Sequence, residues 1–309
     1  MELNFKKISA YTLLLPILGF YLVGCTTNNR APQTVQNNPS PTNTPTPDSS
    51  PFMQESEDRV ELPNEWTSVY DGALFIKLAY PNEWYLRPAT NRQGELAVYS
   101  FDPSQTPNQG SVPASEIKVG IVYFGPNDPR ESTPNENSII SETQRSIDGY
   151  RARVMDSRGQ RGSAKIVEIM INKDETYLIS AYPLESELMP TFLEMLDYID
   201  LDARAPVSIN SFEVSSTIQS PAQINGTIIG SWLFEGQTKI ELRGFNSDLI
   251  AESTISTNQD WMTNEKINFQ GKVNFDDPDE NGGYLYIQKS NPSGLVNKQE
   301  TFSVPVRFN

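Results

Sequence analysis

The 309-residue chain contains no histidine and a single cysteine, Cys25. Without histidine, the sequence excludes Ser-His-Asp and Cys-His catalysis, zinc sites with histidine ligands and a histidine general base. A lone cysteine excludes an intrachain disulfide, a CxxC motif and a thiolate metal cluster. These absences exclude more chemistry than any motif suggests, and we predict no cofactor.

Basic residues are scarce, with 24 Lys and Arg against 39 Asp and Glu, so the formal net charge is −15. Nucleic acids bind through lysine and arginine, and a polyanion repels phosphate backbones. We therefore predict that nucleic acid is not a partner. Anionic lipid headgroups are also repelled, so attachment to a membrane would have to be made by lipid rather than by charge.

The one long hydrophobic run lies at the amino terminus, at positions 8–23, directly after two lysines. It spans roughly 16 residues and is interrupted by Pro16, so it is too short for a comfortable membrane helix and fits a signal peptide. The run ends in the letters LVGC at 22–25, which resemble the lipobox of bacterial lipoproteins.

The lipobox resemblance implies that residues 1–24 are removed and that Cys25 carries acyl chains such as palmitate. Two or more chains, at about 0.8 kcal/mol per buried CH₂, hold a protein stably on a bilayer. We therefore expect the protein on the extracytoplasmic face of the cell membrane or outer membrane, with the lipid on Cys25 as its membrane contact. The alternative is an ordinary secretory signal with an incidental cysteine.

Residues 25–56 are rich in Pro, Thr and Asn, and prolines recur throughout the segment. So little apolar surface cannot offset the entropy lost on ordering, which predicts a disordered, partly extended tether. The tether would lift the folded part away from the membrane, or it would act as a passive linker.

Residues 57–203 read as an α+β domain. A hairpin is predicted over 164–171 and 176–181, and further strand-like runs lie at 73–80, 95–101, 116–124 and 150–155. We expect a weak helix near 138–146. A second helix is expected after Pro190, because apolar residues follow at helical spacing, at Phe192, Met195, Leu196 and Ile199. An antiparallel sheet covered by this helix is the simplest arrangement.

The sequence YPNEW at 80–84 and the strand-then-helix ending at 176–199 resemble the PsbP proteins of the oxygen-evolving photosystem and their bacterial relatives. This resemblance covers about 140 residues. It implies a PsbP-like fold and brings no catalytic motif.

Residues 206–309 read as all-β, with seven strand-like runs at 207–216, 224–232, 239–245, 249–256, 266–275, 284–289 and 301–308. In the last run, Phe302, Val304, Val306 and Phe308 alternate with more polar residues, as in a half-buried strand. Pro305 within it argues for an edge strand, where no ladder donor is lost. About 100 residues with seven short strands predict an immunoglobulin-like sandwich without its disulfide.

Motifs along 206–309 resemble the immunoglobulin-like domain of bacterial spore germination proteins. They are SPA at 220–222, NG at 225–226, GSWLFEG at 230–236, DWMT at 260–263, NPSGL at 291–295 and PVRF at 305–308. The resemblance implies a non-catalytic β-sandwich with no settled ligand, so it assigns no binding residue. The GerM-type domain of the namesake proteins is not visible, which leaves a germination role in doubt.

Two of these motifs gather large apolar residues beside two carboxylates. The residues are Trp232, Phe234, Glu235, Asp260, Trp261 and Met262. This composition suits a sugar or peptide ligand. The alternative is that the tryptophans fill the core and the acids bond to backbone at strand ends.

A weaker signal for a metal lies at 277–282, where Asp277, Asp279 and Asn281 match the opening of a calcium loop. The twelfth position of such a loop normally supplies a bidentate glutamate, and here it is Gln288. The alternative is an acidic hairpin turn.

Together these features predict a non-enzymatic, lipid-anchored cell-envelope protein. Its two β-rich modules would bind another envelope protein or peptidoglycan. Two alternatives remain open: a hydrolase that uses carboxylates alone, and a receptor for a small ligand or a metal.

Overall fold

The computed structural model describes residues 61–309 except 106–110, 127, 129–135, 160–161 and 277. The expected signal peptide (1–24), the tether (25–56) and Cys25 lie outside the described residues, so those expectations stay predictions. Contacts group Asp58–Asn309 as one compact unit. The described part is mostly β with two sheets, which confirms the β-rich character of the prediction. It includes no helix that is both long enough and apolar enough to cross a bilayer.

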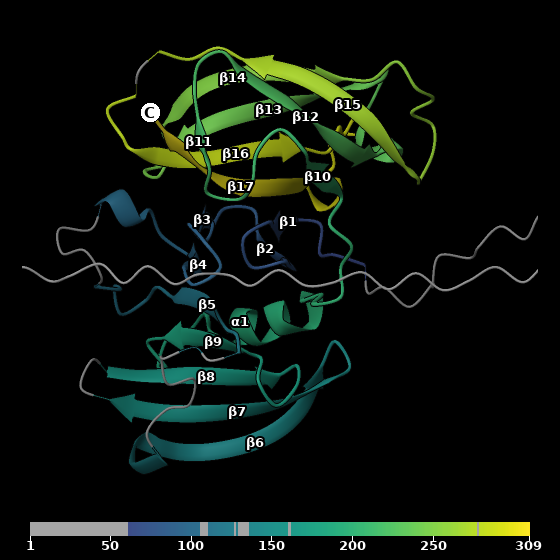
Figure 1. The fold of residues 1–309 in the computed structure, drawn as a ribbon. Coiled ribbons are helices and arrows are strands. Elements are labelled where there is room, and N and C mark those ends of the chain that lie inside the picture. The colour runs from purple at the N-terminus through teal and green to yellow at the C-terminus, as the bar shows by residue number, and fades with distance from the viewer. Residues whose placement is uncertain (1–60, 106–110, 127, 129–135, 160–161, 277) are drawn as a thin grey trace, which may run out of the picture. The chain divides into compact units, whose positions relative to one another are not determined.

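The first sheet is antiparallel and has seven strands in the order β3-β4-β5-β9-β8-β7-β6, part of which can be followed in Figure 1. The strands are β3 (Tyr85–Arg87), β4 (Glu95–Tyr99), β5 (Lys118–Phe124), β6 (Ile139–Ile147), β7 (Tyr150–Gly159), β8 (Gly162–Met170) and β9 (Thr176–Tyr182). β8 and β9 pair from Lys165↔Ala181 to Met170↔Thr176, which confirms the predicted hairpin.

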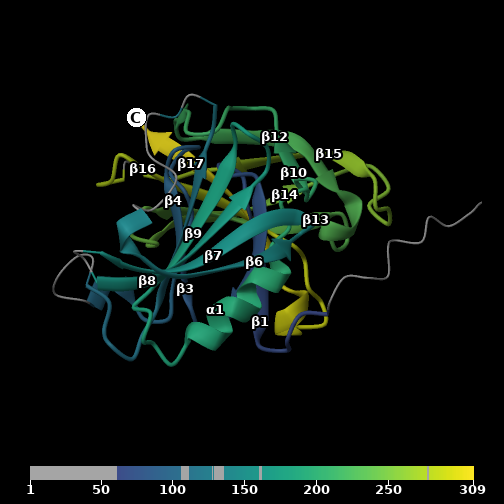
Figure 2. The ribbon, with the colours of Figure 1, turned by 90° about the horizontal axis from the view of Figure 1, so that it is seen from below.

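A short helix, α1 (Met189–Met195), follows this sheet and continues into a 3₁₀ turn at Leu196–Tyr198. Pro190 lies in its first turn, and the four apolar residues predicted at helical spacing are all buried in the core beneath the sheet. A helix is therefore present at Pro190 as predicted, but it is shorter than the apolar spacing suggests, because Ile199 already has extended backbone. Figure 2 shows α1 beside the strands of the first sheet.

The helix predicted near 138–146 is wrong, because this segment forms β6. β6 is the last strand of the sheet, and Ile147 is its one fully buried residue. A strand exposed on both faces carries no alternating apolar pattern, so pairing with β7 decides its conformation.

The second sheet has the order β10-β12-β15-β14-β13-β16-β17-β1-β2, and β11 also pairs with β17. The strands are β1 (Trp66–Asp71), β2 (Ile76–Pro81), β10 (Val207–Ile209), β11 (Thr217–Ile218), β12 (Ala222–Ile229), β13 (Gln237–Gly244), β14 (Leu249–Ser256), β15 (Lys266–Val273), β16 (Gly282–Gln288) and β17 (Glu300–Phe308). Further 3₁₀ turns lie at Pro103–Gln105, Glu136–Ser138, Gly230–Trp232 and Val296–Lys298. The predicted run 207–216 is a strand only over its first three residues.

The prediction that β17 is an edge strand is wrong, because it pairs with β16 on one side and with β1 and β11 on the other. Pro305 is tolerated because it lies between the two shorter partners, which pair with residues 300–303 and 307–308. Ser215 N–H donates to the carbonyl of Pro305 (2.9 Å), so the proline nitrogen faces this same gap. The four apolar residues predicted on one face of β17 all lie in the core, but the prediction of a half-buried strand is wrong, because Ser303 and Pro305 between them are buried too.

β1 links the two predicted modules. Its register with β17 is parallel, from Ser68↔Glu300 to Asp71↔Ser303. Lys77 on β2 forms an ion pair with Glu300, and the Tyr284 hydroxyl donates to the Pro88 carbonyl (2.7 Å). We call these contacts the join. The predicted boundary near 203–206 separates two hydrophobic cores, with Tyr70 of β1 packed in the second core, but the sheet runs across it.

Candidate binding site at the loop end of the second sheet

Three connections of the second sheet lie side by side: 230–236 before β13, 257–265 between β14 and β15, and 289–299 between β16 and β17. Backbone hydrogen bonds tie them together, from Ser231 N–H to the Thr263 carbonyl (2.8 Å) and from Ser290 N–H to the Trp232 carbonyl (2.9 Å). They surround a hollow of about 360 Å³. This loop-end hollow is lined by Ser231, Leu233, Phe234, Trp261, Met262, Thr263, Asn264, Ser290 and Pro292.

A tight turn presents Phe234 at the edge of the loop-end hollow. Phe234 and Gln237 exchange two backbone hydrogen bonds of 3.0 and 3.1 Å, and the two residues between them have positive φ, 53° at Glu235 and 75° at Gly236. This is the pattern of a type I′ turn, which favours glycine at its second central position. The Phe234 side chain is left 46% exposed.

Gly230 lets two of the connections approach closely. A Cβ atom at this position would lie 2.6 Å from the Trp261 carbonyl oxygen and 2.7 Å from that of Thr263. Because both obstacles are backbone atoms, any other residue would push the 261–263 segment away. Gly230 therefore allows the backbone of 261–263 to lie against the segment that leads to Phe234.

The aromatic floor of the hollow is formed by Phe234 and Trp261, whose ring centroids lie 6.1 Å apart in an edge-to-face arrangement. Trp261 is partly buried against the core, whereas the neighbouring Met262 is 76% exposed. Asp260 Oδ1 accepts the Met262 backbone N–H (3.0 Å) and so orders this segment. Three of the six predicted site residues, Phe234, Trp261 and Met262, therefore meet in one place.

The other three predicted site residues do not line the hollow. Trp232 is only 2% exposed and packs in the core, as expected of a large side chain that fills a small sandwich. Glu235 and Asp260 are exposed beside the hollow, and Asp260 bonds to backbone. For Trp232 and Asp260, the structural alternative describes their positions better than a ligand contact does.

Six lining residues were not predicted as site residues from the sequence: Ser231, Leu233, Thr263, Asn264, Ser290 and Pro292. The signal that could have found them is the alternation of antiparallel strands. Connections that follow every second strand fall at the same end of a sheet. The connections after β12, β14 and β16 do so here, but the predicted strands gave no register that would bring their side chains together.

The weak metal candidate is not supported by a cluster of ligands. Asp277 lies outside the described residues, and the Asn281 backbone carbonyl accepts the Phe308 N–H (3.1 Å). Within the described ranges, no group of three or more His, Cys, Asp or Glu side chains is placed to hold a metal ion.

Asp71, at the end of β1, is a fully buried carboxylate. Burial raises its pKa to about 6, although three backbone N–H donors act in the opposite direction. Its Oδ1 accepts from Ala73 (2.9 Å) and Leu74 (2.8 Å), and its Oδ2 accepts from Ala89 (2.9 Å). Both oxygens therefore hold backbone in place, which is a structural role at the join.

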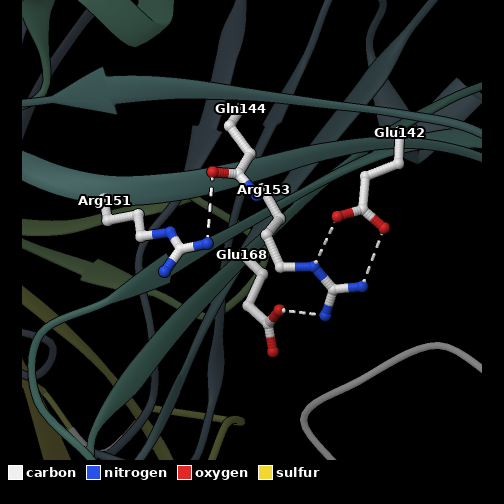
Figure 3. Close-up of polar contacts among 5 residues, drawn as sticks. All are labelled: Glu142, Gln144, Arg151, Arg153 and Glu168. Atoms are coloured by element: carbon white, nitrogen blue, oxygen red, sulfur yellow. Dashed lines mark hydrogen bonds and ion pairs between the residues drawn. The ribbon is translucent and has the colours of Figure 1, made fainter.

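A pair of carboxylates on the first sheet is bridged by an arginine (Figure 3). Arg153 on β7 donates to Glu142 on β6 (3.1 and 2.9 Å) and to the buried Glu168 on β8 (2.9 Å). The hydrogen bonds from Arg153 hold the pKa of Glu142 below its usual range. Arg151 donates to Gln144 (3.1 Å) alongside. These contacts fasten the edge strand β6 to its neighbours.

No family model matches the chain, and no curated protein matches it. A solved crystal structure from Bacteroides thetaiotaomicron VPI-5482 is similar to 48% of the chain, with 8% sequence identity and a TM-score of 0.28. The matched part spans about half, 54%, of that second chain. A likeness of this size supports no inference about fold or activity.

Proposed function

We propose that the chain is a non-enzymatic, lipid-anchored envelope protein that binds a wall polymer or another envelope protein through the loop-end hollow. The observation that carries this proposal is the hollow itself, in which Phe234 and Met262 are exposed beside Trp261. Exposed apolar side chains grouped in a concave site with a few polar groups are typical of binding surfaces.

The proposed anchor is lipid on Cys25, on the extracytoplasmic face of the cell membrane or outer membrane. The LVGC sequence at 22–25 supports it, and the Pro-rich segment 25–56 would supply the distance between bilayer and hollow. The net charge of −15 makes an electrostatic attachment to anionic lipid unfavourable, so acyl chains would have to hold the protein.

We further propose that residues 206–309 are an immunoglobulin-like sandwich related to that of the spore germination proteins. The strand order supports this, because β10-β12-β15-β14 followed by β13-β16-β17 is the order of strands in the two sheets of such a domain, although here β14 and β13 also pair and join them into one sheet. For residues 57–203 we propose a PsbP-like relationship, supported by the antiparallel seven-stranded sheet followed by α1. Neither relationship supplies a binding residue.

Mass spectrometry of the full chain expressed in a bacterium tests the anchor. We expect a mature amino terminus at Cys25 that carries acyl chains, and we expect Cys25→Ser to stay unprocessed. A mature protein that begins elsewhere or lacks acyl groups would refute the anchor without affecting the hollow.

Co-sedimentation tests the binding role, with fragment 58–309 added to isolated envelopes. We expect the fragment to pellet with the envelopes, and we expect Phe234→Ala with Met262→Ala to remain in the supernatant. Leu249→Ala is the matched control, because Leu249 is a 50% exposed apolar residue at the opposite end of β14. Equal retention of all three proteins, or of none, would refute the proposed role.

A further inference from the structure

The polar groups of the loop-end hollow are all uncharged. Hydroxyls come from Ser231, Thr263 and Ser290, and a carboxamide comes from Asn264, while no ionisable side chain is among the described residues that line it. Hydroxyl and carboxamide groups can each donate and accept hydrogen bonds, although the Ser290 hydroxyl already donates to the Gln237 carbonyl (3.2 Å) and the Thr263 hydroxyl already accepts from Glu265 N–H (3.1 Å). The hollow therefore combines two aromatic rings with uncharged polar groups at its rim. Such a rim suits neutral ligand groups that both donate and accept hydrogen bonds.

The shape of the hollow fits poorly with the common ways of binding a peptide. Strand addition needs a free strand edge, a helix needs a long groove, and acidic motifs need a cluster of arginines. Here three connections at the end of a sheet surround an open hollow of about 360 Å³. A stable protein partner would cover roughly 800 Å² on each side, far more than such a hollow supplies.

The charge of the chain and of the residues beside the hollow further restricts the class of ligand that can bind there. The chain carries a net charge of −15, and exposed Glu235 and Asp260 flank the hollow. An anionic polymer would be repelled from this surface, and the lining has no cation among its described residues to offset the repulsion. A neutral ligand avoids this penalty.

Resting on the proposed binding role, we infer that the loop-end hollow binds an uncharged saccharide. One apolar C–H face of a sugar ring would pack on the exposed Phe234 ring, and the Trp261 ring, which meets Phe234 edge to face, would contact the edge of the sugar. Its hydroxyl groups would exchange hydrogen bonds with Ser231 and Asn264 at the rim. Aromatic rings combine large contact area with fixed geometry, which suits the apolar C–H face of a rigid sugar ring.

Isothermal titration of fragment 58–309 with neutral chito-, cello- and malto-oligosaccharides tests the inference, with polygalacturonate as an anionic comparison. We expect at least one neutral series to bind with a Kd in the millimolar range or below. Phe234→Ala should weaken that binding about tenfold or more, and Asn264→Ala should weaken it severalfold. Leu249→Ala should leave it unchanged. The Kd should change less than about twofold between low and high salt, because the ligand is neutral.

The inference is overturned if no neutral oligosaccharide binds, if polygalacturonate binds better, or if Phe234→Ala binds as well as the parent fragment. Co-sedimentation separates this failure from failure of the proposed role. If the envelopes retain the fragment only when Phe234 is present, and protease treatment of the envelopes abolishes this retention, then the partner is a protein. The proposed binding role would stand, and the saccharide would be refuted. Retention that survives protease and is lost after digestion of wall glycan supports the saccharide. Retention that does not need Phe234 refutes both.

Discussion

The second sheet keeps two groups of large side chains in opposite surroundings. At the join, Tyr70 and Tyr284 are almost fully buried, and the Tyr284 hydroxyl has a backbone acceptor on the segment before β4. At the loop end, Phe234 is about half exposed and the adjoining Met262 is mostly exposed. The buried group is accounted for by packing, whereas the exposed group contributes little to the core. Its apolar area is available to a ligand.

The largest expected difference is in the free energy of unfolding, and it is expected between substitutions of two residues of the same loop. Trp232→Ala removes a core side chain and should lower the free energy of unfolding by about 3–5 kcal/mol. Phe234→Ala, two residues away, should change it by less than about 0.5 kcal/mol. Urea unfolding of fragment 58–309 measures both. Similar losses for the two variants would mean that Phe234 also belongs to the core and would remove the contrast.

The next largest effect is the pH dependence of the stability that Asp71 contributes at the join. The pKa of Asp71 is raised from 3.8 to about 6 by burial, so the folded protein holds a proton there that the unfolded chain releases between pH 4 and 6. The contribution of Asp71 to stability is therefore greatest below pH 4 and declines as the pH rises through 6, by about 3 kcal/mol in all.

Subtracting the unfolding free energy of Asp71→Asn from that of the parent fragment isolates this contribution, because the other carboxylates cancel. The difference should fall between pH 4 and 7 and stay level above pH 7. A difference that stays level between pH 4 and 7, and instead rises with pH below pH 4, would show that the three backbone donors outweigh burial, and that the pKa is lowered.

A smaller effect is expected from the hydroxyl of Tyr284, which donates to the buried Pro88 carbonyl (2.7 Å). Tyr284→Phe leaves this carbonyl without that donor and should lower the free energy of unfolding by about 1–2 kcal/mol. Tyr85→Phe is the control, because Tyr85 is an exposed residue on β3, and it should have almost no effect. Equal effects would show that the hydrogen bond does not stabilise the join.

The smallest effect should have the opposite sign. The Ser303 hydroxyl on β17 is buried and has no hydrogen-bond partner among the described residues. Ser303→Ala removes a desolvated polar group, and it should raise the free energy of unfolding by at most about 1 kcal/mol. A clear loss of stability would show that the hydroxyl has a partner in the folded protein.

The sequence predicts the elements whose side chains follow a regular pattern. The β8–β9 hairpin, α1 at Pro190 and the apolar face of β17 are all present where the pattern places them. β1 has no such pattern, because Thr67, Ser68 and Asp71 are polar and yet buried. Its burial results from pairing with β17, which lies at the far end of the chain, and local sequence carries no sign of that contact.

The sequence predicts which types of residue form the candidate site, but it identifies only some of the residues that line it. Phe234, Trp261 and Met262 stand out as large apolar residues in short motifs between strands. Trp232 shares the same motif but turns into the core, because a 3₁₀ turn at Gly230–Trp232 places it there. Ser290 and Pro292 reach the hollow only through the register of β16 and β17, which composition does not reveal.

Oxidation of Met262 tests most directly whether the hollow is the contact with the envelope. Met262 is 76% exposed, so dilute peroxide should convert it readily to the sulfoxide in free fragment 58–309. The proposed role predicts that sulfoxide formation at Met262, followed by peptide mass spectrometry, slows severalfold when the fragment is bound to isolated envelopes. An unchanged rate at Met262 in the envelope-bound fragment would contradict it.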